Sequence, residues 1–264
     1  MADQVIVDGI EVFEKTFSRY KDSFVIIGGT ACRAMLSGGM YAPRRTEDID
    51  MVLVLDRLDK DFIDTFWSFI KSGRYRCATR KDKDGQKKYV LYSFYDGLPE
   101  YPSQIELLSR PLESLGDPEG HHIEAVSVDD ASYLSAIILE PDYYDYLVNH
   151  TEEKNGLRYA SVDSIIVLKV LAYLNLREDK RNGRHVNDVD FKKHRRDVVM
   201  AAASLGLGDS FPVGENIRQS ITRFIEAVNG DPGVRQSISA SLSLADESML
   251  DNYLKVLDES FTAI

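Results

Sequence analysis

The chain has 264 residues, of which 44% are hydrophobic and 28% charged, so it can bury the core of one large domain or two small ones, and disorder is not expected. It has no run of eighteen apolar residues and no basic N-terminal region followed by an apolar block, so we expect neither a membrane helix nor a signal peptide. Two cysteines, Cys32 and Cys77, make neither a disulfide framework nor a zinc site, and a cytoplasmic protein is the simplest expectation.

The net charge of −11 argues against broad nucleic-acid binding, but the charge is uneven. The segment Lys71–Lys88 holds eight basic and two acidic residues, and Arg177–Arg196 holds eight basic and four acidic residues. Two such basic islands could attract a polyanion locally, or they could be two solvated surfaces.

The first half of the chain alternates between helical and strand patterns. Helical spacing of apolar residues predicts a helix over 5–20, and a short apolar run predicts a buried strand over 23–27 that ends at Gly28-Gly29. The patterns that follow predict a helix over 30–37, a strand over 49–55, a helix over 59–71, and strands over 74–78, 88–94, 103–109 and 122–126.

The second half is predicted to be helical. Helices are expected over 129–139, 142–149, 161–176, 190–205, 215–229 and 245–257. The sequence therefore predicts an α+β fold, with a mixed sheet and flanking helices in residues 1–128 and a helical bundle in residues 129–264.

The turn Gly28-Gly29-Thr30 joins the predicted strand to a helix. Glycines let the backbone approach a ligand closely, and a helix N-terminus offers free N–H groups to a phosphate. The Thr30 hydroxyl could cap the helix or contact that phosphate. Steric need alone would also explain the two glycines.

Asp48 and Asp50 lie two residues apart in the next strand, so their side chains point to the same face. Two carboxylates at the end of an apolar strand repel each other unless a cation offsets their charge, and Mg²⁺ prefers one or two carboxylates plus substrate phosphates. A solvated strand end is the alternative.

Lys169 is a single cation in the apolar stretch 165–176, where helical spacing surrounds it with apolar residues. Such a lysine favours an anionic partner, and a triphosphate would supply one. Alternatively, the lysine reaches solvent from the edge of a helical bundle.

The Gly-Gly turn followed by Asp-x-Asp resembles the signature of polymerase-β-like nucleotidyltransferases. Lys169-x-x-Ala172, the arginines at 177, 181 and 184, and Lys193-His-x-x-Asp197 resemble the helical half of the AbiEii-type toxin nucleotidyltransferases, although His194 stands where that family favours Asp. The resemblance spans residues 23 to 200.

The resemblance implies a nucleotidyltransferase that moves a nucleoside monophosphate from a nucleoside triphosphate to an acceptor hydroxyl, with Mg²⁺ or Mn²⁺ on Asp48, Asp50 and Glu106. It implies a third carboxylate, for which Glu106 is the candidate, although Glu106 could instead form a salt bridge. Gly28, Gly29, Thr30, Arg44, Arg45, Lys169, Lys193 and Asp197 are the expected nucleotide-binding residues.

The resemblance leaves the partners open. RNA, and a tRNA end in particular, a protein or a small molecule are all possible acceptors, and an antitoxin protein is an expected partner. The alternative function is a binding module that keeps the fold without catalysis and acts through a protein partner. The acidic pair argues against that alternative, because an inactive scaffold gains nothing from two repelling carboxylates.

Overall fold

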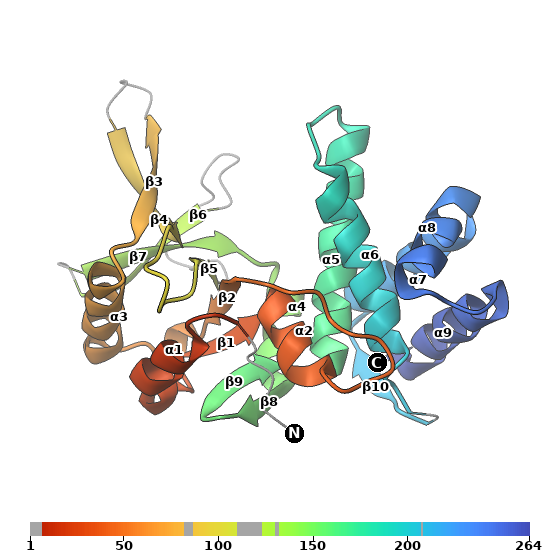
Figure 1. Cartoon of the computed structure of the whole chain (residues 1–264), viewed down its shortest axis with the longest axis horizontal. Coiled ribbons are helices and arrows are strands. Elements are labelled where there is room, and N and C mark those ends of the chain that lie inside the picture. Colours follow the sequence, from red (N-terminus) through yellow and green to blue (C-terminus); the bar gives the residue numbers. More distant parts are fainter. Residues whose placement is uncertain (1–6, 82–86, 110–122, 130–131, 207) are drawn as a thin grey trace. The chain divides into compact units, whose positions relative to one another are not determined.

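The computed structural model of the chain describes residues 7–81, 87–109, 123–129, 132–206 and 208–264 (Figure 1). The chain divides into two compact units. Unit 1 comprises Met1–Ala34 and Arg44–Ala160, and unit 2 comprises Met35–Pro43 and Ser161–Ile264. This division differs from the expected boundary after residue 128, because strands beyond that point still pair within the sheet of unit 1.

Unit 1 is built on a mixed sheet that contains nine strands in the described part of the chain. The strand order is β3-β4-β5-β2-β1-β9-β8, and β7 pairs with both β5 and β6. The strands are β1 (Phe24–Ile27), β2 (Asp48–Leu53), β3 (Arg76–Lys81), β4 (Lys87–Tyr95), β5 (Gln104–Ser109), β6 (Ile123–Asp129), β7 (Ser132–Ile138), β8 (Thr151–Lys154) and β9 (Leu157–Ala160).

A buried aromatic cluster holds the helices of unit 1 against this sheet. Phe13 and Phe17 contact Phe24 of β1 edge-on, with ring centroids 5.9 and 6.1 Å apart, and Phe17 and Phe24 both lie near Phe62. Edge-to-face pairs of this kind add to the stabilisation from burial alone. The cluster fixes β1, whose end leads into Gly28.

The helices of unit 1 are α1 (Ile10–Phe17), α2 (Gly28–Leu36), α3 (Lys60–Ser72) and α4 (Pro141–Asn149), with short 3-10 turns η1 (Ser18–Tyr20) and η2 (Leu55–Arg57).

Unit 2 is a helical bundle in which α5 and α6 pack along each other (Figure 1). The segment 35–43 belongs to this unit, and the Tyr41 hydroxyl lies 2.8 Å from that of Tyr253 on α9. The elements are α5 (Val162–Arg181), α6 (Asp188–Ala202), α7 (Glu215–Asn229), α8 (Pro232–Leu242) and α9 (Glu247–Ser260), with β10 (Phe211–Val213) and β11 (Phe261–Ala263) as a parallel pair.

The α+β class is confirmed, and so are the helices predicted over 142–149, 161–176, 190–205, 215–229 and 245–257, within a few residues at their ends. The helix predicted over 129–139 is wrong, because residues 132–138 form β7, which pairs with β5 and β6. A short apolar run fits a helix or a buried strand equally well, and long-range pairing decides between them. Residues 82–86, between the strands predicted over 74–78 and 88–94, lie outside the described residues.

Two features of unit 1 and unit 2 were not predicted. The β8–β9 hairpin turns at Asn155-Gly156, where both residues have positive φ (51° and 74°), and Asn-Gly is the strongest short hairpin signal in a sequence. Helix α8 was also missed. Among the described residues, none of the helices has the length and apolar character needed to cross a membrane.

Candidate active site

The register of three strands brings the predicted carboxylates onto one face of the sheet. Asp50 lies opposite Ile27 of β1 and opposite Glu106 of β5, and Asp48 lies opposite Gln104. Directly paired residues of neighbouring strands point to the same side, and strands lie about 4.8 Å apart. Ile49 between the two aspartates is fully buried, whereas Asp48, Asp50 and Glu106 are each partly exposed.

The Gly28-Gly29 turn passes directly against this acidic face. Gly28 has a φ of +69°, and a Cβ atom added there would overlap the Asp50 carboxylate. A Cβ atom at Gly29 would lie 2.9 Å from the Thr46 hydroxyl. Both glycines are therefore sterically required, and they bring the first backbone N–H groups of α2 beside the aspartates.

Thr30 has a different partner from the two that we expected. Its side chain is fully buried, and its hydroxyl donates a hydrogen bond of 2.5 Å to the main-chain carbonyl of Asp48. This bond ties the start of α2 to the start of β2 and so positions the Asp48 backbone. The partner is 18 residues away, so no local sequence pattern indicates the contact.

Two neighbours that the sequence analysis missed hold Glu106. The Gln104 amide donates a hydrogen bond of 2.7 Å to Oε1, and the Ser93 hydroxyl donates one of 3.3 Å to the same oxygen. Within the described residues no ion pair involves Glu106, so the salt-bridge interpretation finds no support there. Since both bonds end on Oε1, no described residue hydrogen-bonds to Oε2.

The two predicted arginines, Arg44 and Arg45, lie just before β2. Arg45 is exposed and forms ion pairs with Asp8 at 2.6 Å and Glu47 at 3.7 Å. The main-chain carbonyl of Arg44 accepts a hydrogen bond of 3.5 Å from Arg33. Their role in nucleotide binding stays a prediction.

In unit 2, Lys169 forms an ion pair with Asp197, as expected for a lysine in apolar surroundings. Its Nζ lies 3.3 Å from Oδ2 of Asp197, with side chains only 8% and 2% exposed, and Asp197 also pairs with Arg196 at 3.5 Å. Lys169 is therefore buried and does not reach solvent from an edge of the bundle. Lys193 pairs instead with Asp190 on its own helix, at 2.5 Å. A phosphate contact of either lysine stays a prediction.

Comparison with known families matches residues 13–199 to the nucleotidyl transferase AbiEii toxin of type IV toxin–antitoxin systems. The chain belongs to the AbiEii family. The match contains both the acidic face with Gly28 and the Lys169–Asp197 pair, and it ends in α6. No curated protein and no solved structure gives a significant match. The nucleotidyltransferase type of fold predicted from the sequence is thus confirmed.

The acidic face of this AbiEii protein has the donor atoms that suit a hard divalent cation. Carboxylate oxygens are the ligands that Mg²⁺ prefers, and the glycine turn leaves room for the Asp50 carboxylate, which a side chain at position 28 would displace. In the described part of the chain, no three His, Cys, Asp or Glu side chains are grouped so that they could hold an ion by themselves. A cation held there would therefore need further ligands from outside the protein, such as substrate phosphates.

Proposed function

We propose that this AbiEii protein transfers a nucleoside monophosphate from a nucleoside triphosphate to an acceptor hydroxyl, with Mg²⁺ or Mn²⁺ held by Asp48 and Asp50. The observation that carries this proposal is the strand register, which aligns Asp50 with Glu106 and sets Asp48 beside them on one face. Gly28 lies against the same carboxylates, so a triphosphate and the acidic pair would share one small space.

Each residue has a distinct role in the proposed reaction. A bound divalent cation would lower the pKa of the acceptor hydroxyl and offset the charge of the phosphates. Asp48 and Asp50 would hold it, and Glu106 would join them through Oε2, because its Oε1 already accepts two hydrogen bonds. The backbone N–H groups after Gly28 would bind phosphate oxygens at the N-terminus of α2.

The transfer replaces one phosphorus–oxygen bond by another. The acceptor oxygen bonds to the α-phosphorus, the bond from that phosphorus to the oxygen bridging the β-phosphate breaks, and pyrophosphate leaves with the electron pair. The hydroxyl proton passes to a carboxylate of the acidic face. Catalysis would come chiefly from positioning and charge neutralisation, as in other phosphoryl transfers.

RNA is the acceptor class that the charge distribution favours. The segments Lys71–Lys88 and Arg177–Arg196 carry net charges of +6 and +4 in a chain whose total is −11, so a polyanion would be attracted to these two segments and repelled by the remainder. The toxin family makes an antitoxin protein the expected partner. If RNA is the acceptor, its affinity should fall steeply with added salt, and a flat salt response would contradict this choice.

The experiment that tests the activity measures transfer of label from each α-phosphorus-labelled nucleoside triphosphate to RNA, with Mg²⁺ or Mn²⁺. We expect Asp48→Asn and Asp50→Asn each to lower the rate by about a thousandfold, because each removes a ligand that supplies several kcal/mol of transition-state stabilisation. Cation-dependent binding of the nucleotide should fall in the same variants.

Glu47→Gln is the matched control, because Glu47 is the adjacent exposed acid and pairs with Arg45. It should keep the wild-type rate. Equal rates in the wild type, Asp48→Asn and Asp50→Asn would contradict the proposed site. A wild-type chain that neither transfers label nor binds nucleotide with either cation would favour the non-catalytic binding module.

A further inference from the structure

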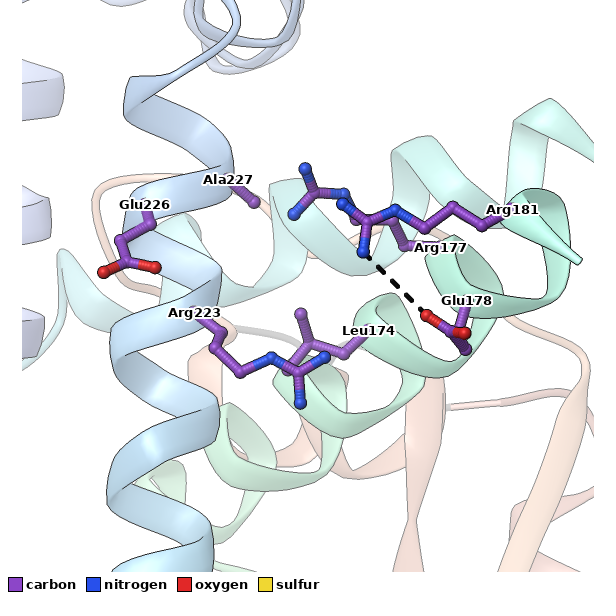
Figure 2. A pocket seen from close by; sticks show the side chains of 7 residues that line it. All are labelled: Leu174, Arg177, Glu178, Arg181, Arg223, Glu226 and Ala227. Atoms are coloured by element: carbon purple, nitrogen blue, oxygen red, sulfur yellow. Dashed lines mark ion pairs between the residues drawn. The ribbon is translucent and has the colours of Figure 1, made fainter.

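A cavity of about 300 Å³ lies within unit 2 between α5 and α7, lined mainly by charged side chains (Figure 2). Helix α5 contributes Arg177, Glu178 and Arg181, and α7 contributes Arg223, Glu226 and Ala227. The buried side chain of Leu174 supplies part of an apolar wall. A site of this size suits a phosphate or diphosphate group better than a whole nucleotide.

The arginines of this cavity are poorly neutralised. Neither Arg177 nor Arg223 makes a hydrogen bond or ion pair with any other residue that the structure describes. Arg181 pairs with Glu178 at 3.9 Å, near the limit of an ion pair. Figure 2 shows the three guanidinium groups extending into the space between the helices, with the Glu226 carboxylate turned away from them.

Three like charges facing one cavity repel each other, and Arg177 and Arg181 are also i,i+4 neighbours on one helix face. Arg177 is partly exposed, and Arg181 and Arg223 are exposed, so the pocket is open to solvent. The repulsion between the three charges is unfavourable in the isolated chain, and an anion placed between the helices would relieve it.

We propose that this pocket binds a phosphate group. Guanidinium groups match the oxygens of phosphate and of carboxylate, but the pocket already contains Glu178. A carboxylate ligand would bring only one charge against that competitor. A phosphate monoester carries about 1.5 to 2 negative charges and three acceptor oxygens, and two adjacent phosphodiesters of an RNA backbone together carry about 2 charges, so either source matches three arginines from two helices.

The pocket uses none of the residues proposed for the catalytic chemistry. All of its residues belong to unit 2, and α7 lies beyond residue 199, where the match to the AbiEii family ends. Arg223 thus gives the C-terminal part of the chain a binding role. The phosphate can be a free polyphosphate or part of an RNA backbone. A free polyphosphate needs only the pocket, whereas an RNA also needs protein surface beyond it.

The test measures binding of inorganic pyrophosphate by calorimetry and of a short fluorescent RNA by anisotropy, both with a chelator so that no divalent cation contributes. We expect Arg177→Gln/Arg223→Gln to weaken binding of the phosphate probe by at least about tenfold, the effect of one lost charged hydrogen bond. Glu178→Gln should tighten it, because a competing carboxylate is gone.

Arg218→Gln is the matched control, because Arg218 lies on α7 with Arg223 but pairs with Asp258 at 2.6 Å outside the pocket. It should bind both probes like the wild type. The pocket variants should unfold at the wild-type temperature or above it, since repulsion is relieved, so lost binding would not reflect lost folding.

The two probes distinguish the sources of phosphate. Loss of pyrophosphate binding in the pocket variant indicates a free polyphosphate, and loss of RNA binding alone indicates a backbone phosphate. Unchanged binding of both probes, or no binding by the wild type, would overturn the proposal. The proposal would also be overturned if polyglutamate bound as tightly as pyrophosphate and pyrophosphate did not displace it. None of these outcomes depends on whether the chain transfers nucleotides.

Discussion

At the scale of single residues, the Asp50 carboxylate occupies the space that a side chain at position 28 would need. The Gly-Gly turn is therefore more than a flexible joint. It allows α2 to begin directly beside the acidic pair, and Thr30 then anchors that helix to the backbone of Asp48.

We expect Gly28→Ala to abolish nucleotide transfer, because the new methyl group displaces the Asp50 carboxylate. Gly38→Ala is the matched control, since Gly38 also has a positive φ (+91°) but an added Cβ atom meets open space. Both variants should lose about 1 kcal/mol of stability from backbone strain. Equal transfer rates in the two variants would show that the Asp50 contact does not matter.

Lys169 and Asp197 form a buried pair in unit 2, and breaking it should be costly. Lys169→Met removes the ion pair of the buried Asp197 carboxylate with the Lys169 ammonium, and we expect a loss of about 3 kcal/mol in urea unfolding. Lys193→Met removes a half-exposed pair and should cost less than about 1 kcal/mol. The double variant Lys169→Met/Asp197→Leu tests whether the two residues are coupled. If its loss of stability equals the sum of the losses in the two single variants, they are not coupled.

At the scale of elements, two of the errors of prediction concern segments whose packing partners are distant in the sequence. The segment 132–138 pairs with strands on either side of it, and helix α8 packs against α6 and α7. Neither partner is visible in a window of ten residues. By contrast, helices α7 and α9 have clear apolar periodicity and were predicted almost to the residue.

Helix α8 carries a local start signal that can be tested. Asp231 caps it by accepting hydrogen bonds from the backbone N–H groups of Gly233 at 2.9 Å and Val234 at 3.1 Å, and Pro232 follows at the first helical position. We expect Asp231→Ala to lower the free energy of unfolding by about 1 kcal/mol, and Asp231→Asn to keep most of it. Equal stability of all three chains would rule out the cap.

At the scale of the whole molecule, buried tyrosines make both units sensitive to alkaline pH. Burial, together with a hydrogen bond to Tyr253, raises the pKa of Tyr41 from 10.0 to about 12, and burial also raises the pKa of Tyr75 and of Tyr159. The folded state thus holds these protons more tightly than the unfolded state does.

The stabilisation from these tyrosines is fully present below pH 10, the unfolded value, and is lost as the pH rises from there toward about 12. We expect the free energy of unfolding to fall across that range, with tyrosinate absorbance rising as the fold is lost. Tyr41→Phe should lose less stability over the same range. A flat stability curve there would show that the tyrosines titrate normally.

The sequence alone determined the α+β class, most helices and the residues of the acidic motif, because apolar periodicity and Asp-x-Asp spacing act over a few neighbouring residues. Tertiary structure decided which distant residues meet: Gly28 with Asp50, Glu106 with Gln104 and Ser93, and Lys169 with Asp197. It also decided that Arg223 faces a cavity with Arg177. These contacts depend on strand register and helix packing, which are set by the burial of many side chains at once and which no local pattern encodes.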